Sequence, residues 1–178
     1  PNRVLPHNQY LALGRAYLVL RDVSDNPLYL ERATQMARYF KRFLRQDGDA
    51  YVWNYWDWPE GGEMKNSRAE DTSHGRIDIE FVVEACRRNV VFADEDLVRF
   101  ANTFTKRMWN GSVDSPRIGD RVNRKKGDAR TFAGWIELSQ WDQQILEIYK
   151  TIFRNGDNQP VTAIPGILVA QKALDSGE

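Results

Sequence analysis

One of the two histidines in the chain stands in a cluster of ionisable residues, EDTSHGRIDIEF, at positions 70–81. His74 follows Glu70 and Asp71 closely, and Asp78 lies about one helical turn further on. A capped helix start explains the acidic residues, because carboxylates stabilise the positive N-terminal end of a helix. It does not explain His74, because the helix dipole disfavours imidazolium there. The same effect keeps the imidazole neutral near pH 7, as proton transfer requires.

The same cluster has two simpler interpretations. Ser73 or Thr72 is expected to cap a helix that begins here, which would give the acidic residues a structural role. A metal site is the other alternative, formed by Glu70, Asp71, His74 and Asp78. These residues match no recognised ligand spacing, so no metal is predicted.

An aromatic stretch, YVWNYW at positions 51–56, precedes this cluster. Tyr51, Trp53 and Tyr55 alternate, so in an extended conformation their rings share one face, and Trp56 follows. The rings either close the end of a helical bundle or form a platform on which a sugar ring stacks. Three polar residues nearby could bind sugar hydroxyls: Asn54, Asp57 and Glu60. Nucleic-acid bases are a less suitable ligand for these rings than a sugar, because this stretch is acidic rather than basic.

The elements that must position these residues are predicted to be helices of two alternating kinds. Helices that are apolar on most sides alternate with helices that are apolar on one face, which predicts stacked helical hairpins. The first kind is expected to begin near Asn8, Ser73, Thr131 and Thr162, and the second near Pro27, Ala93 and Asp142. This uneven spacing differs from short superhelical repeats. We therefore expect an all-α fold, an open or partial α/α-hairpin toroid of three to four hairpins, with residues 1–178 as one domain or part of a larger toroid.

Both histidines are expected on one rim of this fold. His7 stands where the first broadly apolar helix starts, beside Asn8, and His74 stands where the second starts. The aromatic connection, residues 48–72, leads into the second of these helices and could pair as a short β-hairpin. Helix N-termini that converge on one mouth favour anions. The basic connection at 110–130 is expected to be solvated and mobile, although its basic residues from Arg117 to Arg130 could contact an acidic polysaccharide.

Three stretches resemble the six-hairpin α/α-toroid group of carbohydrate-active proteins: LPHNQYLALGRAYL (5–18), DGDAYVWNYW (47–56) and EDTSHGRIDIEF (70–81). This group includes glycoside hydrolases, unsaturated-uronyl hydrolases, and polysaccharide lyases of the alginate- and heparin-lyase type. The resemblance implies a polysaccharide or oligosaccharide partner, and we favour one that contains uronate.

The resemblance implies two chemistries. A lyase needs a base near the C5 proton of a uronate, here Tyr55 or His74. It also needs a group that neutralises the carboxylate, and the candidates are Asn8, His7 and Arg68. A hydrolase needs two carboxylates that flank the glycosidic bond, and the candidates are Glu70, Asp71 and Asp78. Three further residues are expected to bind the sugar: Trp53, Asn54 and Trp56.

A non-enzymatic alternative keeps the aromatic stretch and the rim without proton chemistry. In this interpretation the chain is a helical carbohydrate-binding or protein-interaction module. An open toroid favours it, because half a ring leaves a shallow cleft.

The composition of the chain argues against several other classes of function. Lys plus Arg and Asp plus Glu both number 25, and this balance argues against a dedicated nucleic-acid or membrane-surface binder. No apolar run is long enough to cross a bilayer, so no membrane insertion is expected. Cys86 is the only cysteine, which excludes an intramolecular disulfide. No cofactor is predicted and a protein partner is possible. The compartment stays open, with a periplasmic or secreted location favoured.

Overall fold

The computed structural model describes residues 4–57, 68–129, 133–155 and 163–176, and most of them are helical. The α-helices are α1 (His7–Asp22), α2 (Pro27–Phe43), α3 (Thr72–Arg87), α4 (Asp94–Asn102), α5 (Ala133–Ile136), α6 (Gln144–Asn155) and α7 (Ala163–Ser176). A π-helical segment η1 (Thr103–Met108) continues α4, and a 3₁₀ segment η2 (Glu137–Gln140) continues α5. The all-α prediction is therefore confirmed.

A short antiparallel hairpin is the one sheet among the described residues. Its strands are β1 (Arg45–Asp47) and β2 (Ala50–Val52). Asp47 pairs with Ala50, so the turn has two residues, and Gly48 there takes a φ of 61° that glycine adopts without strain. A hairpin was expected in this region, and it forms at the start of the aromatic stretch.

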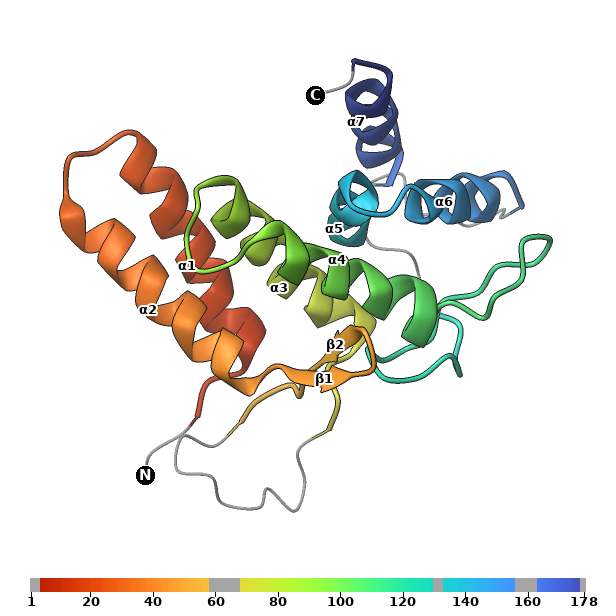
Figure 1. Ribbon diagram of the computed structural model, residues 1–178, viewed down its shortest axis with the longest axis horizontal. Helices are drawn as coiled ribbons and strands as arrows, with labels where there is room; N and C mark the ends of the chain where they lie inside the picture. Colours follow the sequence, from red (N-terminus) through yellow and green to blue (C-terminus); the bar gives the residue numbers. More distant parts are fainter. Residues whose placement is uncertain (1–3, 58–67, 130–132, 156–162, 177–178) are drawn as a thin grey trace.

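The helices pack in two series. The broadly apolar helices contact one another in order, α1 with α3, α3 with α5, and α5 with α7. The others cover them, since α2 packs on α1, α4 on α3, and α6 on α7 (Figure 1). This arrangement agrees with the alternation predicted from apolar patterning, and it brings the starts of α1 and α3 to the same end of the molecule (Figure 1).

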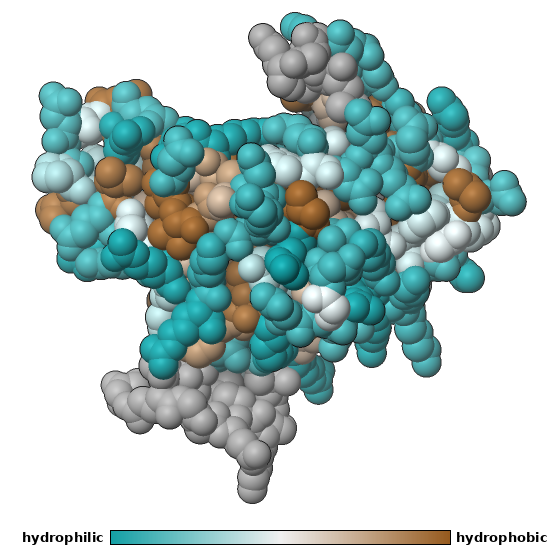
Figure 2. All heavy atoms as spheres, viewed as in Figure 1, coloured by the Kyte–Doolittle hydropathy of each residue, from teal (hydrophilic) through white to brown (hydrophobic). Residues whose placement is uncertain are grey.

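The free side of α1 is more exposed than the apolar pattern predicts. Leu11 and Leu18 are buried, but Leu13, Val19 and Leu20 are exposed. The prediction that α1 is buried on most sides is therefore wrong. The reason is the place of α1 in the inner series: among the described inner helices α3 lies between α1 and α5, whereas α1 contacts α3 alone and is covered on another side by α2. Figure 2 shows hydrophobic side chains gathered over the α1–α2 end of a face that is otherwise mainly hydrophilic.

A close approach between α1 and α3 depends on a glycine. A Cβ on Gly14 would lie 2.8 Å from Cε2 of Phe81 and 3.2 Å from Sδ of Met36. Phe81 is fully buried, so its ring cannot move aside cheaply.

We predict that Gly14→Ala destabilises the protein, although alanine is the better helix former. Overpacking a well-filled core typically costs roughly 1–3 kcal/mol, which exceeds the gain of about 0.5–1 kcal/mol from helix propensity. Urea unfolding followed by circular dichroism measures the difference, with the exposed Ala12→Ser as the control. A more stable Gly14→Ala variant would show that the Phe81 ring has room to shift.

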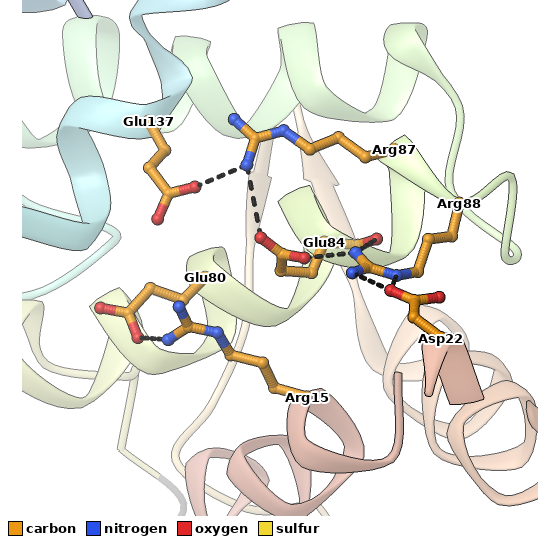
Figure 3. A network of polar contacts seen from close by, with 7 residues as sticks. All are labelled: Arg15, Asp22, Glu80, Glu84, Arg87, Arg88 and Glu137. Carbon is orange, nitrogen blue, oxygen red and sulfur yellow. Dashed lines mark hydrogen bonds and ion pairs between the residues drawn. The ribbon is translucent and has the colours of Figure 1, made fainter. Parts of the chain in front are cut away.

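A network of ion pairs joins the inner helices (Figure 3). It connects α1, α3 and η2 through the pairs Arg15–Glu80, Arg88–Asp22, Arg88–Glu84, Arg87–Glu84 and Arg87–Glu137. Most of these side chains are partly exposed, and such pairs individually contribute little to stability. We infer that the network mainly aligns α1 and η2 along α3.

The basic connection is ordered by backbone hydrogen bonds over residues 110–129. Gly119 N–H donates to Met108 O at 2.8 Å, and Ala129 N–H donates to Ile118 O at 2.8 Å. Ile118 and Val122 are buried in the core. These two side chains therefore anchor the connection to the core, while residues 123–128 are exposed to solvent, as expected. Arg130 lies outside the described residues.

Candidate functional site

Three backbone segments lie side by side at the start of α3. Tyr55 N–H donates to Arg68 O at 2.9 Å, and Glu70 N–H donates to Trp53 O at 3.0 Å. On the other side, Val122 N–H donates to Glu70 O at 3.0 Å. The aromatic stretch, the entry to α3 and the basic connection are therefore held together by main-chain pairing.

An open pocket of about 500 Å³ lies where these segments meet. Its lining residues are Tyr55, Trp56, Arg68, Asp71, His74 and Arg121. The structure thus brings together both candidate bases of the predicted lyase, one candidate neutralising residue and one candidate sugar-stacking ring.

Asp71 is the N-cap of α3, in place of the expected Ser73 or Thr72. Its Oδ1 accepts hydrogen bonds from the backbone N–H groups of Ser73 and His74, both at 2.9 Å, and from the Ser73 hydroxyl at 2.5 Å. An acidic cap also complements the positive end of the helix dipole. The helix start therefore fixes the Asp71 carboxylate in one orientation.

The second oxygen of Asp71 orients the His74 ring. Nδ1 of His74 lies 2.7 Å from Asp71 Oδ2, and a carboxylate only accepts hydrogen bonds, so Nδ1 carries the proton. In the neutral ring the lone pair is then on Nε2. The His74 side chain is 42% exposed and lines the pocket. This Asp–His arrangement is the one that general-base catalysis uses.

The Asp71 carboxyl is held in its charged form. Burial alone would raise its pKa, but hydrogen bonds from Ser73 and from the His74 backbone, together with the His74 ring, outweigh burial and lower the pKa. Asp71 therefore remains an acceptor for His74 throughout the neutral range.

Two aromatic rings lie beside His74. The Tyr55 ring centroid is 5.2 Å from that of His74, and the Trp56 centroid is 5.0 Å from that of Tyr55. Both side chains are half-buried. The pocket wall therefore carries a phenol within reach of the imidazole and an indole next to it.

Trp53 was predicted to stack on a sugar, and the structure contradicts this. Its side chain is fully buried, its Nε1–H donates to Asp78 Oδ2 at 2.8 Å, and its ring lies on Trp135 with centroids 6.2 Å apart. Tyr51 is buried as well. Of the two interpretations of the alternating rings, closure of the helical bundle is correct for Tyr51 and Trp53.

Glu70 and Asp78 were candidate carboxylates for a hydrolase, and both are fully buried. Neither lines the pocket, so neither can flank a glycosidic bond there. Asp78 faces inward on α3, where its Oδ2 accepts the Trp53 Nε1–H. Asp71 lines the pocket, but its role is to cap α3 and to orient His74.

His7, Asn8 and Asn54 do not line the pocket either. The backbone N–H of His7 donates to Tyr55 O at 3.0 Å, so α1 does start beside the aromatic stretch. The His7 ring, however, is buried between Asp57 and Tyr10, with Nε2 3.0 Å from Asp57 Oδ2 and Nδ1 2.5 Å from the Tyr10 hydroxyl.

The two asparagines have different surroundings. Asn8 is buried on α1, and no described group donates to its Oδ1. Asn54 donates to Asp57 Oδ1 at 2.8 Å and accepts from Arg45 at 2.7 Å. Glu60, the third polar residue considered for sugar binding, lies outside the described residues.

Three ionisable groups at the start of α3 lie close enough together to approach one cation. Glu70, Asp71 and His74 each have one potential ligand atom within 4.8 Å of the others. Nδ1 of His74 is already hydrogen-bonded to Asp71, and Oε1 of Glu70 accepts the Asp71 N–H at 2.9 Å. Hydrogen bonding alone therefore explains why these groups lie together.

Arg121 is the pocket residue that the sequence did not single out. It belongs to a basic connection that was expected to be solvated, and it pairs in antiparallel fashion with Asp71. Its guanidinium Nη1–H donates to Ala69 O at 2.5 Å, which holds the side chain against the pocket wall. The sequence did contain one signal that this segment packs against the core, namely the apolar neighbour Val122.

Comparison of the chain with protein-family models, with curated proteins and with solved structures gives no match. Within the part of the chain that the structure describes, no helix is both long enough and apolar enough to cross a membrane. The pocket at the start of α3 is therefore the feature of the described structure that indicates a function.

Proposed function

We propose that this protein is a carbohydrate-active domain that binds a uronate-containing polysaccharide at the pocket and cleaves it by β-elimination. The observation that carries the proposal is the pairing of an Asp71-oriented His74 with Arg68 and Arg121 around one open cavity. A base and two cations in one site match a substrate whose acidic C–H lies next to a carboxylate.

The two arginines support an anionic substrate. A guanidinium forms charge-assisted, often bidentate hydrogen bonds with a carboxylate. Such pairing withdraws charge from the carboxylate and stabilises the enolate that forms when the neighbouring C–H loses its proton. Arg68 belongs to the segment that leads into α3, and Arg121 belongs to the segment paired beside it, so two adjacent segments each contribute a guanidinium to the pocket.

His74 and Tyr55 divide the proton transfers in this proposal. Nε2 of His74 takes the C5 proton, and the electron pair forms the C4–C5 double bond as the C4–O4 bond breaks. The Tyr55 hydroxyl, whose ring lies beside His74, donates a proton to the departing O4. The product carries an unsaturated uronate at its new non-reducing end.

Trp56 gives the substrate an apolar surface. The C–H face of a pyranose packs on aromatic rings, and Trp56 lines the pocket next to Tyr55. The burial of Glu70 and Asp78 makes a hydrolase a poorer fit, because hydrolysis requires two carboxyls at the bond that breaks.

A second candidate is binding without catalysis. The pocket is open to solvent, as the exposure of His74 shows, and an open site suits recognition of a long polymer. At the level of the fold, we propose that the series α1, α3, α5 and α7 is an open part of an α/α toroid, with α2, α4 and α6 outside it.

The test is a screen of polysaccharides that monitors absorbance of the unsaturated uronate and tryptophan fluorescence in parallel. New absorbance with uronate polymers and none with neutral glucans is the expected result. A fluorescence change without any product would support the binding module, and no response to any uronate polymer would contradict both candidates.

Arg121 provides a separate prediction about substrate charge. Arg121→Gln is expected to weaken binding of a uronate polymer by about tenfold or more, because one charge-assisted contact is lost. Fluorescence titration at two salt concentrations measures the change. Arg117→Gln is the matched control, since Arg117 is an exposed residue of the same connection that does not line the pocket. Equal losses in both variants would mean that net charge, rather than a pocket contact, binds the polymer.

A further inference from the structure

Two carboxyl side chains are fully buried beneath the pocket. Glu70 precedes α3 and Asp78 lies on it, and neither has any exposed surface. Each has one oxygen with an assigned donor. Oε1 of Glu70 accepts the Asp71 backbone N–H at 2.9 Å, and Oδ2 of Asp78 accepts the Trp53 Nε1–H at 2.8 Å.

The remaining oxygens need a proton. Oε2 of Glu70 and Oδ1 of Asp78 are buried, and no described group donates to them. The two carboxyls are close enough for each to shift the pKa of the other. Two carboxylates cannot hydrogen-bond to each other, because each only accepts. One proton between them gives both remaining oxygens a partner.

The surroundings of the pair are apolar and acidic. The stacked rings of Trp53 and Trp135 cover it, and a Cβ on Gly75 would lie 3.5 Å from Cγ of Glu70 and 3.0 Å from Cζ2 of Trp135. The titratable groups that face the pair are Asp71 and His74 at the start of α3 and Tyr10 of α1. The charge that acts on the pair from Asp71 is negative, so this neighbour favours uptake of a proton.

The pair lies directly behind the Asp71–His74 group. Its Oε1 accepts the Asp71 N–H and lies 4.0 Å from Nδ1 of His74. Any change in the charge or position of Glu70 therefore acts on Asp71 through this hydrogen bond and on His74 across 4.0 Å.

We propose that Glu70 and Asp78 share a single proton and that this pair is a positioning element for Asp71 and His74. Glu70 is a positioning residue and touches no substrate. The inference goes beyond the proposed function, since it holds whether the pocket catalyses elimination or only binds a sugar.

The shared proton has a consequence for stability. Burial, and next the charge of Asp78, raise the pKa of Glu70 to about 9. In the unfolded chain a glutamate loses its proton near pH 4.3, so between that pH and about 9 the folded state binds one more proton than the unfolded state. Stability from this site therefore falls as the pH rises through that window.

Glu70→Gln removes this dependence while preserving the contacts. The amide oxygen can accept the Asp71 N–H, and the amide N–H can donate to Oδ1 of Asp78, as the shared proton does. We expect the melting temperature of Glu70→Gln relative to the natural chain to rise steadily from pH 5 to pH 8.5, by about 5 °C or more in total. Glu147→Gln, at an exposed glutamate, is the control and should show a flat difference.

The experiment combines this pH series with nuclear magnetic resonance of the folded natural chain and Glu70→Gln between pH 7 and 10. In the natural chain the Asp71 amide signal should titrate as the pair loses its proton, and the His74 Nδ1–H should exchange faster with water over the same range. Both signals should stay constant in Glu70→Gln. A charge that was merely nearby would shift the His74 signal without changing its exchange.

Two results would overturn the proposal. A flat difference in melting temperature across the pH series would show that no proton is shared in the folded state. An Asp71 or His74 signal that behaves identically in both chains would show that the pair does not hold them. Neither readout depends on turnover, so a failed polysaccharide screen leaves this test intact.

Discussion

Replacing His74 with alanine is expected to lower the turnover of a uronate polymer by roughly 10²–10⁴-fold, the usual contribution of a general base. The ring nitrogen that would take the C5 proton is Nε2, because Nδ1 is hydrogen-bonded to Asp71. Binding should change little, since Arg68, Arg121 and Trp56 remain to hold the sugar. Initial rates from product absorbance, with KM and kcat separated, measure the effect.

Asp71→Asn is the companion variant that separates orientation from folding. Asparagine is also a good N-cap, so α3 should keep its start. Its amide, however, can present an N–H to Nδ1 of His74, which then holds the imidazole in the tautomer whose Nε2 carries the proton. Turnover should fall by an amount comparable to His74→Ala with little change in melting temperature. Unimpaired turnover in both variants would assign the base to Tyr55.

Trp53→Ala is expected to cause the largest loss of stability, about 3–5 kcal/mol, as large-to-small substitutions of buried aromatic residues do. Trp53 is fully buried against Phe40, Phe100 and Trp135. The substitution also removes the N–H that Asp78 Oδ2 accepts, which leaves a buried carboxyl oxygen without its donor. Urea unfolding followed by far-ultraviolet circular dichroism gives the free energy of unfolding.

Two further variants make this prediction specific. Trp53→Phe keeps an aromatic ring and loses the N–H, so it should cost roughly 1–3 kcal/mol. Trp56→Ala is the matched control in the same stretch, because Trp56 lines the pocket and is only half-buried. It should weaken sugar binding while destabilising the protein far less. If Trp53→Ala proved as stable as Trp56→Ala, the burial of Trp53 in the core would be wrong.

The sequence alone determined the helical class and the alternation of the helices. Apolar residues on most sides of one helix and on one face of the next follow the 3.6-residue period, and the contacts among α1, α3, α5 and α7 agree with that pattern. His74, Tyr55, Trp56 and Arg68 were also named from the sequence as site residues, and they line one pocket. His74 was named because a helix start by itself does not explain a histidine at that position.

Only the tertiary structure separated the buried aromatic and acidic residues from those of the pocket. Trp53 and Tyr55 have the same spacing and similar chemistry, yet Trp53 contacts Asp78 in the core and Tyr55 contacts His74 at the surface. Local periodicity places a side chain on a face, but packing between elements decides whether that face is covered.

The same limit explains Arg121 and the buried pair. Arg121 reaches the pocket because its backbone pairs with residue 71, fifty positions earlier in the chain. Glu70 and Asp78 are both buried because of how α3 packs, and the shared proton that we propose follows from that burial. The sequence by itself determined the helices and the chemical groups at their starts. The tertiary structure decided which groups meet, because contacts between distant segments depend on the whole packed core.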